Sequence, residues 1–230
     1  MPDPGPGVCG VCRGPVAGGR QVCFACGVVA RRLGRPLAPV VPVRLCPLPS
    51  PLYTVLLGYK ESPVAEARLR FGAIVSALLV EFLLHHAARL EARAGGPFDV
   101  ALLVPSTHRP GTAPLGQVDG LGRDVADALP AVRWAPGLLR RTHARGGPPP
   151  VAHMRPDPAA FSPRAPEKGE VAGARALLLD DIYVSGARAQ SAAAALQRAG
   201  ARATLIVPLG RVLRPDRVAS HADFLRRHVA

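Results

Sequence analysis

The apolar positions near the C-terminus predict a strand, a short loop, a helix and a second strand. Residues 177–179 and 203–208 form two short, mostly apolar runs, and residues 189–199 between them are strong helix formers. Gly200 stands where a glycine commonly ends a helix. Two strands joined by a helix within about thirty residues form a right-handed parallel unit. Because the apolar runs are continuous rather than alternating, we expect a parallel sheet covered by helices on both faces.

The rest of the pattern predicts further elements along the chain. Ser62 can cap a helix that has Pro63 in its first turn, and an apolar face carries this helix to Gly95. The other expected elements are a strand over 52–57, a helix over 119–129, a long loop over 142–170 and a C-terminal helix over 216–229. The 230 residues therefore predict an α/β protein with one full domain and a small additional module.

Two adjacent carboxylates follow the first of the two apolar runs. A strand over 177–179 would bring Asp180 and Asp181 to the carboxyl edge of the sheet, where open α/β folds bind their ligands. The loop and helix N-terminus that follow can hold a phosphate, because unpaired N–H groups and the helix dipole attract an anion. Carboxylates beside a phosphate cradle fit a phosphorylated sugar. The alternative is an ordinary Rossmann-like unit with an accidental acidic pair at a strand end.

The run from Leu177 to Arg188 resembles the signature of the type I phosphoribosyltransferases, which bind phosphoribosyl pyrophosphate (PRPP). The resemblance implies the Rossmann-like parallel sheet of that fold, with Asp180 and Asp181 as catalytic-site acids that hold the ribose hydroxyls. The 5′-phosphate loop would consist of Val184, Ser185, Gly186, Ala187 and Arg188. Val184 cannot accept a proton, so this loop offers no general base.

Arg188 stands where the family usually has a threonine that contacts the phosphate. An arginine could bind phosphate in its place, with a longer stem and a different geometry. The backbone amides and Ser185 can already satisfy most of the phosphate oxygens. We therefore expect the Arg188 side chain to point into solvent.

Four cysteines near the N-terminus form two CxxC pairs separated by ten residues: Cys9, Cys12, Cys23 and Cys26. Four thiolates at this spacing can surround one Zn²⁺ tetrahedrally, as in a structural zinc site. The segment has few large apolar residues, so a bound metal would supply much of its stability. Disulfides and a redox-active CxxC pair are the alternatives.

A four-cysteine module ahead of a PRPP motif resembles the ComF family, phosphoribosyltransferase-like proteins linked to DNA uptake in naturally competent bacteria. Weaker matches are Gly58-Tyr59-Lys60, the run 99–105 as a first core strand, and the segment 155–161. The family's Arg-Gly-Phe-Asn-Gln element is absent, and the most similar segment of this chain is 114–117.

The resemblance implies displacement of pyrophosphate at ribose C1 with Mg²⁺, and Arg109, just beyond 99–105, would contact the pyrophosphate. A PRPP sensor without turnover, or an accessory protein of DNA uptake, is the alternative reading. Both readings expect PRPP or a related phosphorylated ribose to bind.

Changes in composition along the chain indicate domain boundaries, and the net charge indicates a class of possible partners. We assign residues 1–35 to the zinc module, 36–51 to a proline-rich linker, 52–212 to the phosphoribosyltransferase-like domain and 213–230 to a helical tail. The formal net charge is +13, or about +11 with a four-thiolate zinc site, and it allows nucleic acid or DNA-uptake machinery as a partner. The densest basic cluster is Arg140, Arg141 and Arg145, but 27 of the 29 basic residues are arginines, which also fits compositional bias.

The N-terminus lacks a basic and apolar signal peptide, and no run of eighteen uncharged apolar residues occurs. We therefore expect a cytoplasmic protein that does not insert into a membrane.

Overall fold

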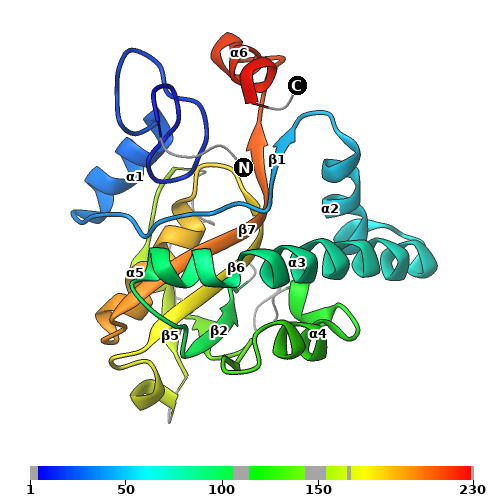
Figure 1. Cartoon of the computed structure of the whole chain (residues 1–230), viewed down its shortest axis with the longest axis vertical. Helices are drawn as coiled ribbons and strands as arrows, with labels where there is room; N and C mark the ends of the chain where they lie inside the picture. The colour runs from blue at the N-terminus through cyan, green and yellow to red at the C-terminus, as the bar shows by residue number, and fades with distance from the viewer. Residues whose placement is uncertain (1–4, 106–113, 143–153, 165–166, 229–230) are drawn as a thin grey trace.

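The computed structural model describes residues 5–105, 114–142, 154–164 and 167–228 (Figure 1). Its centre is a five-stranded sheet in the order β1–β7–β6–β2–β3, in which all four neighbouring pairs are parallel. The strands are β1 (Arg44–Pro47), β2 (Val100–Leu103), β3 (Arg133–Trp134), β6 (Arg175–Tyr183) and β7 (Ala203–Leu213). The expected α/β class with a parallel sheet is confirmed.

Helices cover both faces of this sheet. One face carries α1 (Phe24–Leu33) and α5 (Ala187–Arg198), and the other carries α2 (Pro51–Glu61), α3 (Ala65–Ala94) and α4 (Leu121–Ala128). Successive strand residues point to opposite faces, so Leu178 packs in the core on the α5 side while Leu177 and Leu179 pack on the α3 side. This double burial explains why residues 176–179 of β6 form a continuous apolar run.

The expected strand over 52–57 is wrong, because these residues lie in helix α2. Ser50 caps the helix, its Oγ accepting a hydrogen bond from the Tyr53 N–H at 3.2 Å, and Pro51 occupies the first turn. Ser62 does not cap α3 as expected; its N–H bonds to the Gly58 carbonyl and closes α2, and α3 begins at Ala65. A short apolar run fits a strand and a buried helix equally well.

Part of the expected loop over 142–170 has regular structure. Strand β4 (Leu139–Arg141) pairs antiparallel with β5 (Phe161–Pro163), and three 3-10 turns complete the described elements: η1 (Pro114–Gln117), η2 (Pro158–Ala160) and η3 (Glu167–Glu170). Arg140 and Arg141 of the basic cluster therefore lie in β4, whereas Arg145 falls outside the described residues. The C-terminal helix is α6 (Ala219–His228), close to the expected range.

The described part of the N-terminal segment, from residue 5 to residue 50, packs onto the sheet. Strand β1 pairs with β7 from Arg44 to Pro47, within the stretch that we assigned to a linker. Helix α1 contacts α5, and the four N-terminal cysteines share one buried apolar cluster with strands β2 and β6. The division of the chain into four segments stays a prediction.

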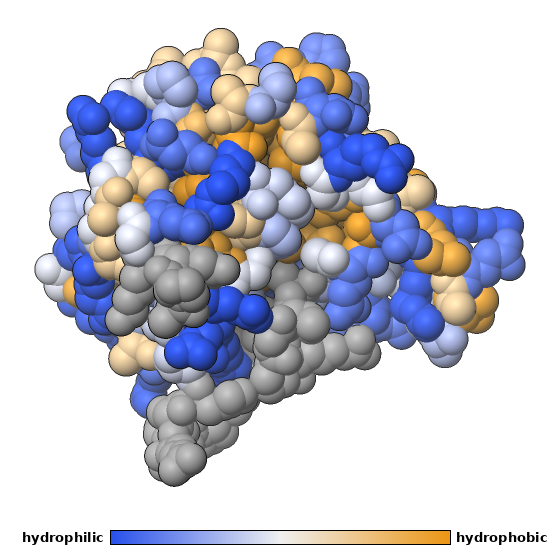
Figure 2. Space-filling view, turned by 90° about the horizontal axis from the view of Figure 1, so that it is seen from below, coloured by the Kyte–Doolittle hydropathy of each residue, from blue (hydrophilic) through white to orange (hydrophobic). Residues whose placement is uncertain are grey.

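Helix α3 is long and apolar enough to cross a membrane by length and composition alone. In the structure it packs against α2, α4 and β7, with Val75, Leu79 and Leu83 fully buried. The core helix of a soluble protein passes the same test, so this helix is weak evidence for insertion. Figure 2 shows hydrophilic residues spread over most of the face seen from below, with smaller apolar areas between them.

Candidate functional site

A cleft of about 1510 Å³ lies where the order of the strands reverses. From β2 the chain adds β3 on one side, and from β6 it adds β7 on the other, so the switch point falls between β2 and β6. Open α/β sheets bind ligands beyond the carboxyl ends of the strands at this point. The cleft lining includes Leu103 and Val104 at the end of β2, residues 179–183 of β6, and parts of α2, α3 and η1.

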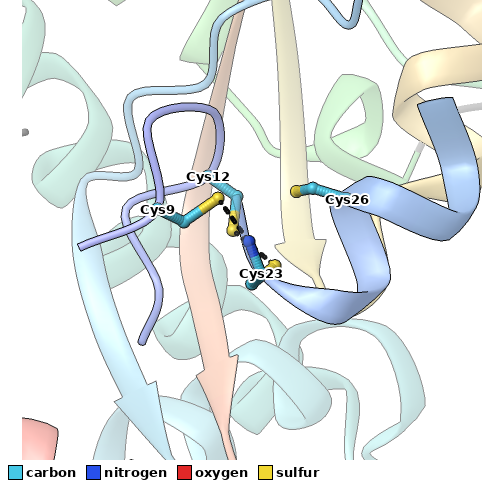
Figure 3. Close-up of side chains that lie close together, drawn as sticks. All are labelled: Cys9, Cys12, Cys23 and Cys26. Atoms are coloured by element: carbon cyan, nitrogen blue, oxygen red, sulfur yellow. Dashed lines mark hydrogen bonds between the residues drawn. The ribbon is translucent and has the colours of Figure 1, made fainter. Parts of the chain in front are cut away.

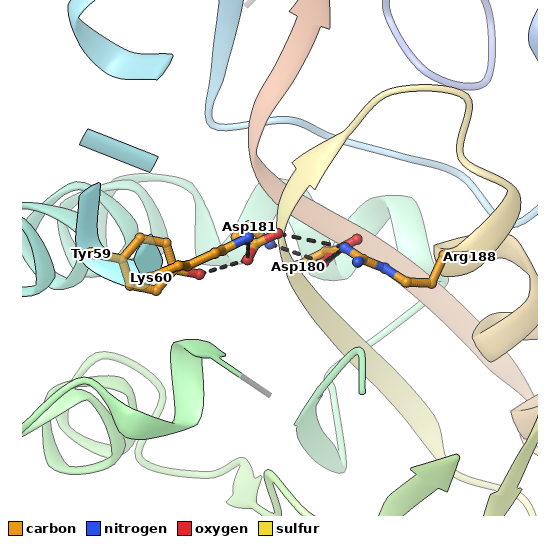
Figure 4. Close-up of polar contacts among 5 residues, drawn as sticks. All are labelled: Tyr59, Lys60, Asp180, Asp181 and Arg188. Atoms are coloured by element: carbon orange, nitrogen blue, oxygen red, sulfur yellow. Dashed lines mark hydrogen bonds and ion pairs between the residues drawn. The ribbon is translucent and has the colours of Figure 1, made fainter. Parts of the chain in front are cut away.

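The two carboxylates predicted from sequence lie at this cleft (Figure 4). Asp180 and Asp181 belong to the last part of β6 and are 5% and 3% exposed. Asp180 Oδ1 accepts a hydrogen bond from the Arg188 guanidinium at 2.8 Å. Asp181 Oδ2 accepts one from the Tyr59 hydroxyl at 2.6 Å and also forms an ion pair with Lys60. Each carboxylate therefore has its own cation, one from α5 and one from α2.

The predicted phosphate loop connects β6 to α5 in a tight turn. Only Val184, Ser185 and Gly186 separate the two elements, and Gly186 caps the helix with φ +82°. A Cβ at this position would overlap Oη and Cζ of the buried Tyr183 side chain, so both the backbone angle and the packing require glycine. The loop and the first turn of α5 line the cleft, and the helix N-terminus can attract an anion there.

The expectation that Arg188 points into solvent is wrong. Its guanidinium contacts both carboxylates, Asp180 at 2.8 Å and Asp181 Oδ1 at 3.5 Å, and the side chain is 30% exposed. Two adjacent buried carboxylates repel one another and lose hydration, and a cation between them offsets both costs. This compensation explains why the arginine turns inward from the second residue of the helix.

Tyr59 and Lys60 are site residues to which sequence reasoning gave no role. The last turn of α2 brings both to Asp181, a residue far along the chain. Two signals were available: the match of Gly58-Tyr59-Lys60 to the ComF pattern, and the rarity of Lys60, one of only two lysines in a chain with 29 basic residues. The assignment of 52–57 to a strand hid both signals, because it left the end of α2 unplaced.

Burial and charge give the two carboxyl groups different acidities. Burial raises the pKa of Asp180 to about 6, even though the Arg188 charge lowers it. Burial also raises the pKa of Asp181, but the charges of Lys60 and then Arg188 more than offset this, so its pKa is lowered. Burial, followed by the Asp181 charge, raises the pKa of Tyr59, whose hydroxyl therefore stays protonated and donates.

We expect the raised pKa of Asp180 to make stability depend on pH. The folded chain holds a proton at pH 5 that the unfolded chain has released, because the ordinary value is 3.8. The bound proton on Asp180 stabilises the folded state. This stabilisation is fully present below about pH 4 and is lost as the pH rises through 6. Relative to Asp180→Asn, wild-type protein should lose about 2–3 kcal/mol of unfolding free energy between pH 4 and pH 7. Urea titrations across this range measure the difference, and parallel profiles for the two proteins would contradict the assignment.

The four N-terminal cysteines converge as their spacing predicts (Figure 3). Their sulfurs lie within 4.8 Å of one another, and Cys12 Sγ and Cys23 Sγ are 3.7 Å apart. Tetrahedral Zn²⁺ with four thiolate ligands places sulfurs about 3.8 Å apart. All five cysteines of the chain are free, so none of the four forms a disulfide. The group is therefore positioned to bind a metal ion.

The surroundings of the cysteines suit a closed structural site. All four side chains are buried, and the Cys23 N–H donates to Cys9 Sγ at 3.3 Å. Hydrogen bonding from Cys23 and then Cys26 holds the pKa of Cys12 well below its usual range, whereas hydrogen bonding with Cys12 raises the pKa values of Cys23 and Cys26. No open position for a substrate is needed in such a site.

Other residues named from the sequence are placed less fully. Arg109 lies outside the described residues. Leu115 and Gln117 belong to η1, the segment that stands in place of the missing Asn-Gln element, and both line the cleft. Asp157 caps η2, its carboxylate accepting from the Ala159 N–H at 3.0 Å.

No protein-family model matches the chain, and no curated protein matches it. Among solved structures, one neighbour is described as the allosteric regulatory enzyme of purine biosynthesis, with 19% identity and a TM-score of 0.33 over 55% of this chain. Another is a glutamine PRPP amidotransferase from B. subtilis complexed with ADP and GMP, with 18% identity and a TM-score of 0.33 over 54% of this chain. The matched part covers 25% of the length of each neighbour.

Proposed function

We propose that the cleft binds PRPP or a related phosphorylated ribose, and that the chain is a phosphoribosyltransferase-like protein of the ComF type. One observation carries the proposal: a buried carboxylate pair and a glycine loop at a helix N-terminus line the same cleft at the strand switch point. Carboxylates accept hydrogen bonds from sugar hydroxyls, and the loop with the helix N-terminus attracts a phosphate. A cytoplasmic location is part of this proposal.

The hydrogen-bonding state of Asp181 supports a hydroxyl-bearing ligand. Its Oδ2 is bonded to Tyr59, whereas its Oδ1 is buried and has no hydrogen-bond partner within the described residues. An unsatisfied buried acceptor is costly, so a ribose hydroxyl donating to Oδ1 would be favourable. Arg188 lies 3.5 Å from this atom, so it has to shift when the hydroxyl arrives.

In this proposal Asp180 and Asp181 hold the ribose, and Val184 to Arg188 surround the 5′-phosphate. The resemblance implies that pyrophosphate leaves ribose C1 with oxocarbenium character, and Arg109 is proposed to contact the pyrophosphate. Mg²⁺ would neutralise pyrophosphate charge while keeping several of its waters. Lys60 and Arg188 already neutralise the two carboxylates, so the protein does not need the metal for that purpose.

A PRPP sensor without turnover, for example an accessory protein of DNA uptake, is the second candidate function. Val184 offers no proton acceptor in the loop, and the cations on the carboxylate pair would have to rearrange for catalysis. Pyrophosphate release in the presence of PRPP and acceptor bases separates the two functions. Sustained release identifies a transferase, and stoichiometric binding without release identifies a sensor.

We expect the double variant Asp180→Asn, Asp181→Asn to lose the ribose contacts while leaving the phosphate loop intact. Loss of charge-assisted hydrogen bonds predicts about tenfold or more weaker binding of ribose 5-phosphate by calorimetry. Inorganic phosphate should bind as before or more tightly, because Lys60 and Arg188 lose their counterions.

A matched control for this charge change is Asp216→Asn, Asp223→Asn, which neutralises two exposed carboxylates far from the cleft lining. The control should bind ribose 5-phosphate like the wild type. If the cleft variant also binds it like the wild type, the acidic pair is an accidental feature of the strand end.

A further inference from the structure

Arg211 lies between the phosphate loop and the four-cysteine centre. It belongs to β7, an interior strand of the sheet, pairs in register with Tyr183 of β6, and is 5% exposed. Its Nη1 donates to the carbonyls of Val184 at 2.8 Å, Tyr183 at 3.3 Å and Val212 at 2.7 Å. The guanidinium also lies 5.5 Å from the centroid of the Tyr183 ring. One buried side chain thus holds the backbone on which the loop begins.

The other side of the same guanidinium faces the first cysteine knuckle. A Cβ added to Gly14, two residues after Cys12, would lie 3.0 Å from Arg211 Nη2 and 3.2 Å from its Nε. The Nε–H is buried without a hydrogen-bond partner, and no carboxylate pairs with Arg211 in the described part of the chain. Burial opposes the charge of Arg211, but Cys12 and then Cys23 more than offset this and raise its pKa. The first cysteine knuckle therefore lies beside this buried cation, in contact with it at Gly14.

The two carbonyl contacts determine the direction of the loop amides. A trans peptide is planar, so its C=O and N–H point in opposite directions. Holding the carbonyls of Tyr183 and Val184 toward Arg211 directs the N–H groups of Val184 and Ser185 away from it. Both of these residues line the cleft, whereas Arg211 does not.

We propose that Arg211 is a positioning residue that couples the four-cysteine centre to the 183–186 loop, so that metal loading of the centre determines how well the loop is ordered to receive a phosphate. The inference rests on the proposed function only in naming phosphate as the ligand of the loop. The ordering itself can be measured without any ligand.

The coupling follows from charge. Four thiolates with one Zn²⁺ carry a net charge of about −2, which stabilises a buried guanidinium beside them. When the metal leaves and the cysteines become neutral thiols or disulfides, this charge disappears. A buried cation bound only to carbonyls then gains by moving toward water, and the carbonyls of Tyr183 and Val184 are released.

Amide hydrogen exchange on the full chain, with and without bound zinc, tests this inference. In the wild type, measured below the melting temperature of the zinc-free protein, zinc removal should speed exchange of residues 183–187 by about tenfold more than exchange of α4, as for loss of a hydrogen bond to a charged group. Arg211→Met should show the same fast exchange while zinc is bound, and zinc removal should then add less than twofold. Arg217→Met, which changes an exposed arginine, should behave like the wild type. Arg211→Lys, which keeps the charge but not the fork of donors, should lie between Arg211→Met and the wild type.

Three results would overturn the coupling. The first is equally fast exchange of the loop with and without zinc in the wild type. The second is that zinc removal speeds loop exchange as much in Arg211→Met as in the wild type, which would make the two effects independent. The third is an equal increase of exchange in the loop and in α4, which lies on the opposite face of the sheet, because this would indicate global loosening. Calorimetry with ribose 5-phosphate is a separate readout: if the wild type does not bind it, the proposed function fails while the exchange result still decides the coupling.

Discussion

Gly186→Ala should destabilise the protein by about 2–4 kcal/mol and remove binding of ribose 5-phosphate. A non-glycine residue at φ +82° costs about 1 kcal/mol, and a Cβ there would overlap the Tyr183 ring, which is 1% exposed. Displacing a packed aromatic side chain costs about 1–3 kcal/mol more. Urea denaturation measures the stability, and calorimetry measures the binding.

Two comparisons separate the backbone cost from the overlap. Gly173→Ala places a Cβ at φ +76° where no atom lies within 4 Å, so it should cost only about 1 kcal/mol. In a Tyr183→Leu background, Gly186→Ala should cost about as little, because the overlapping atoms are gone. An equal cost for Gly186→Ala with and without Tyr183 would show that the ring does not restrict this turn.

Loss of the cysteine centre should have the largest effect on stability. Purified protein is expected to contain about one zinc per chain, and Cys12→Ser should abolish it. In zinc-finger peptides, zinc binding is worth about 10–16 kcal/mol, so even a fraction of this value is a large part of the stability of a domain. The cysteines share a buried cluster with β2 and β6, so we expect the loss to lower the melting temperature of the whole chain. This expectation is stronger than the loosening of residues 1–35 alone that a separate module would show.

Elemental analysis and thermal melts with and without a chelator check the prediction, and added zinc should restore the wild-type melt. Cys46→Ala is the matched control, because Cys46 is also buried but lies outside the group of four. Its zinc content should equal that of the wild type. Metal-free protein in which Cys9, Cys12, Cys23 and Cys26 are joined by disulfides would contradict the metal site.

The sequence predicts those parts of the fold in which neighbouring residues decide the structure. The β6–loop–α5–β7 unit follows from an apolar run, a glycine and a helix-forming stretch in immediate succession. The cysteine centre follows from spacing alone, since two CxxC pairs bring their own geometry. In both cases the determining contacts are short in sequence.

The parts that the sequence did not predict depend on signals other than hydrophobic periodicity. Residues 52–57 lie in a helix whose start is marked by the Ser50 cap and Pro51, a local signal that hydrophobicity does not reveal. The inward turn of Arg188 becomes clear only when both carboxylates are seen to be buried. Lys60 meets Asp181 across more than a hundred residues, so periodicity within either segment carries no information about the pair.

Pairing with β1 also covers one edge of β7, the longest strand of the sheet. Strand β7 spans eleven residues, ten of them buried, and β1 bonds to its last four along one side. Without β1 these backbone groups would form an open, apolar sheet edge, the kind of surface on which chains associate and aggregate. The N-terminal segment therefore has two roles. It carries the four cysteines, and its residues 44–47 cover a sheet edge at which copies of the chain would otherwise associate.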